Sequence, residues 1–98
     1  MMPTIEQIKH EIFISLRKRI QEPGINDIVV EGVVRVGLTK KYQYHLTAEE
    51  FNTIGDELAE GGYFRWNDNG RLALTADGRN TCLGLKQAAD HVLPFILY

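Results

Sequence analysis

The residue types that most often perform catalysis are sparse and widely spaced in this chain. Its one cysteine, Cys82, has no histidine near it in sequence, and a free cysteine on a helix stripe usually behaves as a small hydrophobic residue. His10, His45 and His91 have no recognisable zinc-binding spacing, and Glu6, one helical turn before His10, is expected to form an ordinary surface pair with it. No glycine-rich phosphate loop follows an expected strand. The sequence therefore predicts a protein that is not an enzyme and that holds neither a metal nor a cofactor.

Charged side chains offer a second kind of chemistry, the binding of nucleic acid or of a charged protein. The formal net charge of −2 at pH 7 lacks the basic excess that is usual in nucleic-acid-binding domains. Five acidic and no basic residues lie between Thr47 and Gly61, which leaves eleven basic and eight acidic residues elsewhere. The side chains best suited to contact DNA are Lys40, Lys41, Asn52, Thr53, Arg65 and Arg71. For the alternative, a charged protein partner, the candidates are Glu49, Glu57 and Glu60.

Large apolar side chains in the second half of the chain could serve the core or a partner. Tyr63, Phe64 and Trp66 could stack on bases, but a small domain more often buries such residues, so we expect Phe64 and Trp66 in the core and Tyr63 facing outward. Residues 95–98 are too hydrophobic to stay in water unless they cover the core or a partner. They are expected either to form a homodimer contact or to fold back on their own core. The dimerisation candidates are Leu85, Val92, Phe95, Ile96 and Leu97.

The elements that must position these side chains begin with an amphipathic helix. Apolar residues recur at three- and four-residue intervals from Ile5 to Ile20, and Thr4 with Gln7 matches a capping box at the start. Proline and glycine then end this helix. Residues 25–38 fit both a valine-rich strand and one face of a helix, and a helix is preferred. Residues 40–45 are expected to be a short strand or an exposed connector.

The second half of the chain has clearer boundaries. Thr47 and Glu50 form a second capping box, followed by an apolar stripe and a pair of glycines that allow a helix to end. Two short runs of alternating polarity then flank the turn-forming residues 67–70, which predicts a β-hairpin. Thr75 is expected to cap a last helix that reaches about Val92.

Composition places the chain among small globular proteins. The sequence has 44% hydrophobic and 24% charged residues, close to the averages of soluble domains. A chain of 98 residues has room for one core, so a single domain over residues 1–98 is expected. One cysteine cannot form an intrachain disulfide, and the apolar runs are too short to span a membrane, so we expect a soluble, cytoplasmic protein. The predicted fold class is α+β.

Three stretches of the sequence follow a pattern that is shared with a known family. They are Leu46-Thr47-Ala48-Glu49-Glu50-Phe51, Leu58-Ala59-Glu60-Gly61-Gly62-Tyr63-Phe64 and Leu74-Thr75-Ala76-Asp77-Gly78-Arg79. Over about a third of the chain, this pattern resembles the winged-helix (winged helix-turn-helix) family. The resemblance implies three or four helices with a β-hairpin wing and, by analogy, a small DNA-binding regulator of transcription or an accessory protein.

Two departures from that family bear on the expected function. The helix over residues 48–60 matches the helix that typically enters the major groove, but its outward positions are mainly acidic and would repel phosphate. In addition, residues 25–45 form a longer span than a compact helix-turn-helix requires. We therefore expect DNA binding mainly through wing and loop cations. The alternative is a winged-helix-like protein-interaction module that uses the acidic helix and does not bind nucleic acid.

Overall fold

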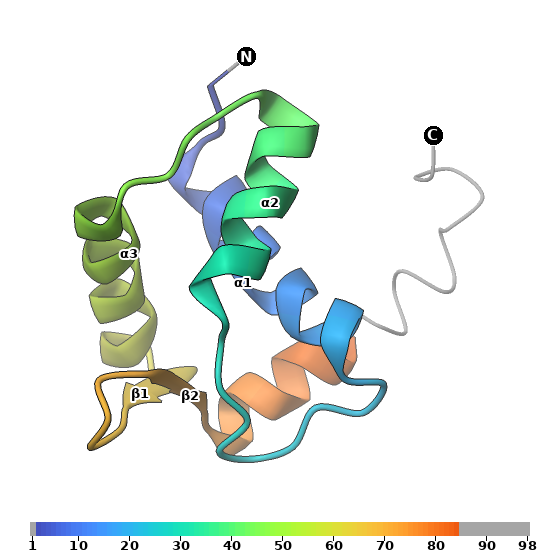
Figure 1. The fold of residues 1–98 in the computed structure, drawn as a ribbon. Coiled ribbons are helices and arrows are strands. Elements are labelled where there is room, and N and C mark those ends of the chain that lie inside the picture. Colours follow the sequence, from blue (N-terminus) through green and yellow to red (C-terminus); the bar gives the residue numbers. More distant parts are fainter. Residues whose placement is uncertain (1, 85–98) are drawn as a thin grey trace.

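The computed structural model describes residues 2–84 of the chain (Figure 1). These residues form a small α+β domain with four helices and a two-stranded antiparallel hairpin, which confirms the expected fold class. The elements, in chain order, are α1 (Ile5–Arg19), α2 (Glu31–Tyr42), α3 (Ala48–Glu60), β1 (Phe64–Trp66), β2 (Leu72–Leu74) and a fourth helix over residues 76–84. Within the described part of the chain, no helix is long and apolar enough to cross a membrane.

The first helix, α1, begins with the expected capping box. The backbone N–H of Gln7 donates to the Thr4 hydroxyl at 3.1 Å, and the Thr4 N–H donates to the Gln7 side chain at 2.9 Å. The central part of the predicted stripe is buried, whereas Ile5 is 51% exposed. Ile5 is exposed because it lies in the first turn of the helix, beyond the edge of the core.

The segment between α1 and α2 differs from the prediction. A helix was preferred for residues 25–38, but residues 25–30 are not helical, and Ile28 forms an antiparallel β-bridge with Ala73. The N–H of Asn26 donates to the Leu74 carbonyl, and that of Val29 to the Leu72 carbonyl, each at 2.8 Å. This segment therefore lies beside the free edge of β2, where it forms a single β-bridge with flanking backbone hydrogen bonds rather than a third strand. Pairing with a distant strand outweighs the local helical pattern.

The helix α2 extends further than expected. The connector or short strand predicted up to His45 is wrong for its first residues, because the helix continues through Tyr42. Gln43 ends it in the left-handed conformation with φ 55°, and its N–H donates to the carbonyls of Leu38 and Thr39. Such a backbone cap is a common end for a helix without glycine.

The helix α3 and the hairpin follow the prediction closely. Thr47 and Glu50 form the expected capping box, and Gly62, just after the helix, has the left-handed backbone conformation with φ 86°. The strands pair with Phe64 opposite Leu74 and Trp66 opposite Leu72. The hairpin prediction is therefore confirmed.

The fourth helix packs directly against the hairpin. The Gly78 N–H donates to the Thr75 hydroxyl at 3.1 Å, which confirms the predicted cap. A side chain at Gly78 would overlap the backbone carbonyl of Tyr63, so glycine allows this close approach. The helix is confirmed through residue 84. The predicted continuation to Val92 and the dimerisation candidates Leu85, Val92, Phe95, Ile96 and Leu97 lie outside the described residues.

One hydrophobic core joins all of these elements. It contains apolar residues from α1, α2, α3 and both strands, together with Val29, Leu46 and Cys82. Phe64 is 1% exposed and confirms its predicted place in the core. Trp66 is only partly buried and packs against the core from its edge, while Tyr63 is 39% exposed and faces outward as expected.

Candidate interaction surface

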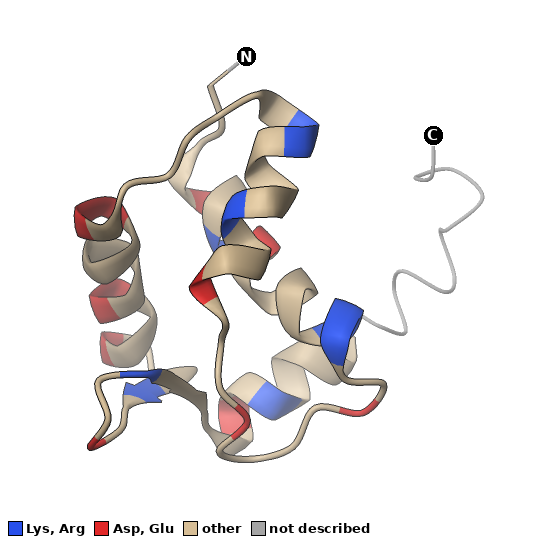
Figure 2. Cartoon of the chain, viewed as in Figure 1, with Lys and Arg blue, Asp and Glu red and all other residues tan. Residues whose placement is uncertain are grey.

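The outward face of α3 is acidic along its length (Figure 2). The helix buries one face against the core and has no basic residue. The buried residues are Phe51, Ile54, Gly55 and Leu58. The exposed residues opposite them include Glu49, Asn52, Thr53, Asp56, Glu57 and Glu60. All predicted contact residues of α3, whether for DNA or for protein, therefore lie on this one exposed face.

Two of these acidic residues hold α3 to the rest of the domain. The Glu57 carboxylate lies 3.0 Å from the Lys9 ammonium of α1, and hydrogen bonding to Glu57 raises the pKa of Lys9. The Trp66 indole N–H donates to Asp56 at 2.7 Å and joins α3 to β1. These two carboxylates are therefore partly engaged inside the molecule. Glu49, in contrast, forms no ion pair with any described residue, and the same holds for Glu60.

Glu50 belongs to the helix cap and differs from the outward acids. Its carboxylate accepts hydrogen bonds from the Tyr44 hydroxyl and from the Thr47 N–H. The Tyr44 hydroxyl, followed by the Thr47 backbone, lowers the pKa of Glu50 below its usual range. The same bond raises the pKa of Tyr44, because the neutral phenol is the donor. Glu50 thus fixes the connection that enters α3.

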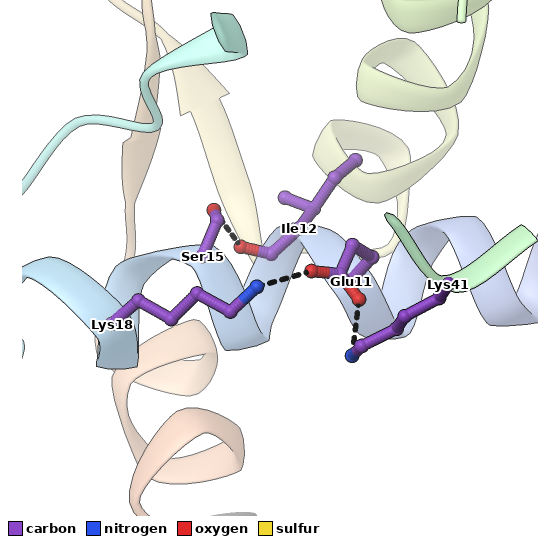
Figure 3. Close-up of polar contacts among 5 residues, drawn as sticks. All are labelled: Glu11, Ile12, Ser15, Lys18 and Lys41. Carbon is purple, nitrogen blue, oxygen red and sulfur yellow. Dashed lines mark hydrogen bonds and ion pairs between the residues drawn. The ribbon is translucent and has the colours of Figure 1, made fainter. Parts of the chain in front are cut away.

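The lysines predicted to contact DNA lie at the end of α2, and one of them is already bound. The Lys41 ammonium donates to Glu11 at 2.7 Å, and Lys18 donates to the other oxygen of the same carboxylate at 3.1 Å (Figure 3). Glu11 is 2% exposed, and Gly37 of α2 leaves the space that its carboxylate fills. Both lysines are exposed, but Lys41 compensates the buried charge of Glu11, whereas Lys40 forms no ion pair with any described residue.

The predicted arginines lie together on the hairpin. Arg65 is paired with Ala73, and Arg71 precedes Ala73 by two residues, so the alternation of strand side chains places both arginines on the same face. This face is opposite the one that buries Phe64. Both arginines are exposed, and Arg65 donates to the Asn26 side chain at 2.9 Å.

The six predicted DNA contacts do not form one basic patch. Lys40 and Lys41 end the helix that precedes α3, whereas Arg65 and Arg71 belong to the hairpin that follows it. Figure 2 shows basic segments on α2 and on the hairpin, and acidic segments along α3. The predicted cations therefore belong to two separate elements, and the helix that carries Asn52 and Thr53 contributes no positive charge.

The cysteine and histidine considered for catalysis or metal binding lie apart in the described part of the chain. Cys82 is fully buried, burial raises the pKa of its thiol, and the thiol lies 3.7 Å from the Phe13 carbonyl oxygen. This environment suits the small hydrophobic residue that the sequence predicts. His10 is exposed, and the expected pair with Glu6 is not formed, because Glu6 pairs instead with Lys9 at 3.7 Å. Within residues 2–84 no three His, Cys, Asp or Glu side chains are grouped closely enough to hold a metal ion.

Sequence reasoning missed three residues that shape this surface. Glu11 is the buried partner of two lysines, and the Tyr44 hydroxyl donates a hydrogen bond to Glu50. The Asn26 side chain accepts a hydrogen bond from Arg65. Glu11 lies next to the apolar residue Ile12 on α1, which is the one signal that could have indicated its burial. The other contacts depend on segments that meet only in the folded chain.

Comparisons with known proteins add no identification. No family model matches the chain, and no curated protein or solved structure is significantly similar to it.

Proposed function

We propose that the chain is a winged-helix-like domain in which the hairpin between β1 and β2 is the wing. The order of elements supports this assignment: α1, an extended segment, α2, α3 and then the hairpin. The segment forms one β-bridge, between Ile28 and Ala73, on the edge of β2 that β1 does not occupy. This bridged segment precedes α2 and accounts for part of the long span between residues 25 and 45 that a compact helix-turn-helix does not require.

Within this fold, we propose that α3 binds a protein partner. The observation that carries the proposal is the acidic outward face of α3, on which Glu49 and Glu60 have no cationic partner among the described residues. In a DNA groove these carboxylates would face phosphates, lose solvation and oppose the release of counterions. Against a basic protein surface the same charges would accelerate association and select the partner.

The experiment compares partner capture by three forms of the whole protein. The test variant is Glu49→Lys with Glu60→Lys, and the control is Glu22→Lys with Asp68→Lys, which makes the same change in charge at exposed positions outside α3. Glu57 is left unchanged because its reversal would place two ammonium groups together. Proteins from the source cells are captured on each form and quantified by mass spectrometry, after circular dichroism has shown that all three forms are folded.

The proposal predicts that partners retained by the wild type and by the control are lost from the α3 variant. Equal capture by all three folded forms would show that the acidic face does not bind them. Because the control carries the same net charge as the test variant, a loss in both would indicate a general charge effect rather than a site on α3.

A second candidate function is DNA binding through the wing, and the shared face of Arg65 and Arg71 favours it. In this alternative the two arginines and Lys40 contact phosphates, while Asn52 and Thr53 are the residues of α3 suited to bases. Replacing both arginines by alanine should reduce the slope of log affinity against log salt by about 1 to 2, measured by anisotropy with a mixed-sequence duplex. An unchanged slope would exclude the wing from DNA contact.

A further inference from the structure

A shallow hollow lies between the start of α1 and the outer side of α3. Its volume is about 330 Å³, and its apolar lining includes Met2, Ile5, Ile8 and Ile54. Two of these side chains are unusually exposed for large apolar residues, Met2 at 73% and Ile5 at 51%. Ile5 continues the apolar stripe of α1, so this helix presents an uncovered apolar surface where it leaves the core.

The rim of the hollow on the α3 side is negatively charged. Glu49, Glu50 and Glu57 line it, whereas no lysine, arginine or histidine of residues 2–84 does. Glu50 is held by Tyr44 and Thr47, and Glu57 is held by Lys9. Glu49 has no ion-pair partner among the described residues, so it is the carboxylate available to a ligand. The hollow thus combines exposed apolar surface with one available negative charge.

We propose that this hollow receives a short basic amphipathic helix from a protein partner. An apolar side chain of that helix lies against Ile5 and Ile54, and a lysine or arginine near it pairs with Glu49. Charge complementarity selects this occupant, since an acidic segment would be repelled by the rim and an uncharged one would leave Glu49 without a partner. This inference rests on the proposed protein-binding role of α3 and specifies the chemical class of the partner.

The probe is a synthetic amphipathic helix of leucine and lysine, about 15 residues long so that it can form a helix. Two matched peptides serve as controls, one with glutamate in place of lysine and one with serine in place of leucine. Each is titrated into the full-length protein and followed by calorimetry and by amide NMR shifts. We expect the leucine and lysine peptide alone to bind, with a Kd below about 1 mM, and to shift the amides of Ile5 and Thr53.

Single substitutions then locate the site. Ile5→Ser should weaken peptide binding at least about tenfold, as loss of a central apolar contact does, and Glu49→Lys should weaken it by a similar factor. Val36→Ser is the control, because Val36 is 54% exposed on α2 and does not line the hollow. Circular dichroism and thermal melting show whether each variant is folded.

The outcomes separate this inference from the proposed function. Absence of binding by the wild type, or equal binding by Ile5→Ser and the wild type, overturns the inference. If Ile5→Ser binds normally while Glu49→Lys with Glu60→Lys loses its cellular partners, α3 binds protein but the hollow is not the site. If Glu49→Lys with Glu60→Lys keeps its cellular partners while peptide binding still requires Ile5, the hollow binds the peptide. The acidic face of α3 is then not the surface that binds those cellular partners.

Discussion

Replacing Gly78 by alanine should destabilise the domain, although alanine is the better helix former. Gly78 lies in the fourth helix, where a Cβ would overlap the Tyr63 carbonyl oxygen and come within 2.9 Å of both the Tyr63 carbonyl carbon and the Leu74 side chain. That carbonyl also accepts the Thr75 N–H at 3.2 Å. The added methyl group must therefore push the helix away from the hairpin, because a backbone carbonyl cannot rotate aside as a flexible side chain can.

The size of the effect follows from two opposing contributions. Alanine in place of glycine favours a helix by about 1 kcal/mol. Overpacking costs about 1 to 3 kcal/mol, and a clash with backbone belongs at the upper end. The expected net loss of unfolding free energy for Gly78→Ala is therefore about 2 kcal/mol, which corresponds to a decrease in Tm of about 8 to 16 °C for a domain of this size.

Gly84 supplies the matched control in the same helix. A Cβ at Gly84 would have no neighbour within 4 Å among residues 2–84, so Gly84→Ala should raise the unfolding free energy by up to about 1 kcal/mol. Thermal melting and urea unfolding of both variants measure the difference. If the two variants stabilised the protein equally, the fourth helix would not be pressed against the hairpin and the reasoning would be refuted.

Three further predictions concern individual side chains. The hydrogen bond from Tyr44 lowers the pKa of Glu50, so this bond stabilises the fold above the ordinary pKa of 4.5 and stops doing so as the pH falls through the lowered pKa of the folded protein. Tyr44→Phe should therefore lose less unfolding free energy than the wild type when the pH is lowered from about 6 to about 3. An equal loss in both proteins would contradict this assignment. The thiol of Cys82 should react with a thiol reagent only after urea is added; rapid reaction of the native protein would show that it is accessible. Gly37→Ala should lower the unfolding free energy of the domain, because the added methyl group would displace the Glu11 carboxylate. In a Glu11→Ala background this loss of unfolding free energy should be smaller by about 1 kcal/mol. Strictly additive effects of the two substitutions in urea unfolding would disprove the contact.

The parts of the fold that could be predicted depend on contacts between close neighbours in sequence. Thr4 with Gln7 and Thr47 with Glu50 are three residues apart, so each capping box is readable from residue types alone. The turn at residues 67–70 is equally local. The acidic face of α3 follows from helical periodicity once its start is known.

The parts that could not be predicted depend on distant segments. Residues 25–30 contain a helix-compatible pattern, but Ile28 instead forms a β-bridge with Ala73 at the open edge of β2. Lys41 has the appearance of a free surface cation, but it binds Glu11, thirty residues away in sequence. Trp66 was expected in the core, yet its indole N–H requires a partner and finds Asp56 at the surface. In each case, tertiary packing determines which of several local possibilities is realised.

Photochemical cross-linking from α3 in the source cells tests the central proposal most directly. Thr53, exposed on the outward face of α3, is replaced by a photoreactive phenylalanine derivative, and the same replacement at exposed Glu22 is the control. If α3 binds a protein, the photoreactive residue at position 53 should give a cross-linked product, and the one at position 22 should not. Protease should degrade this product, and nuclease should leave it intact. A nuclease-sensitive product from position 53 would contradict the proposal and favour DNA binding.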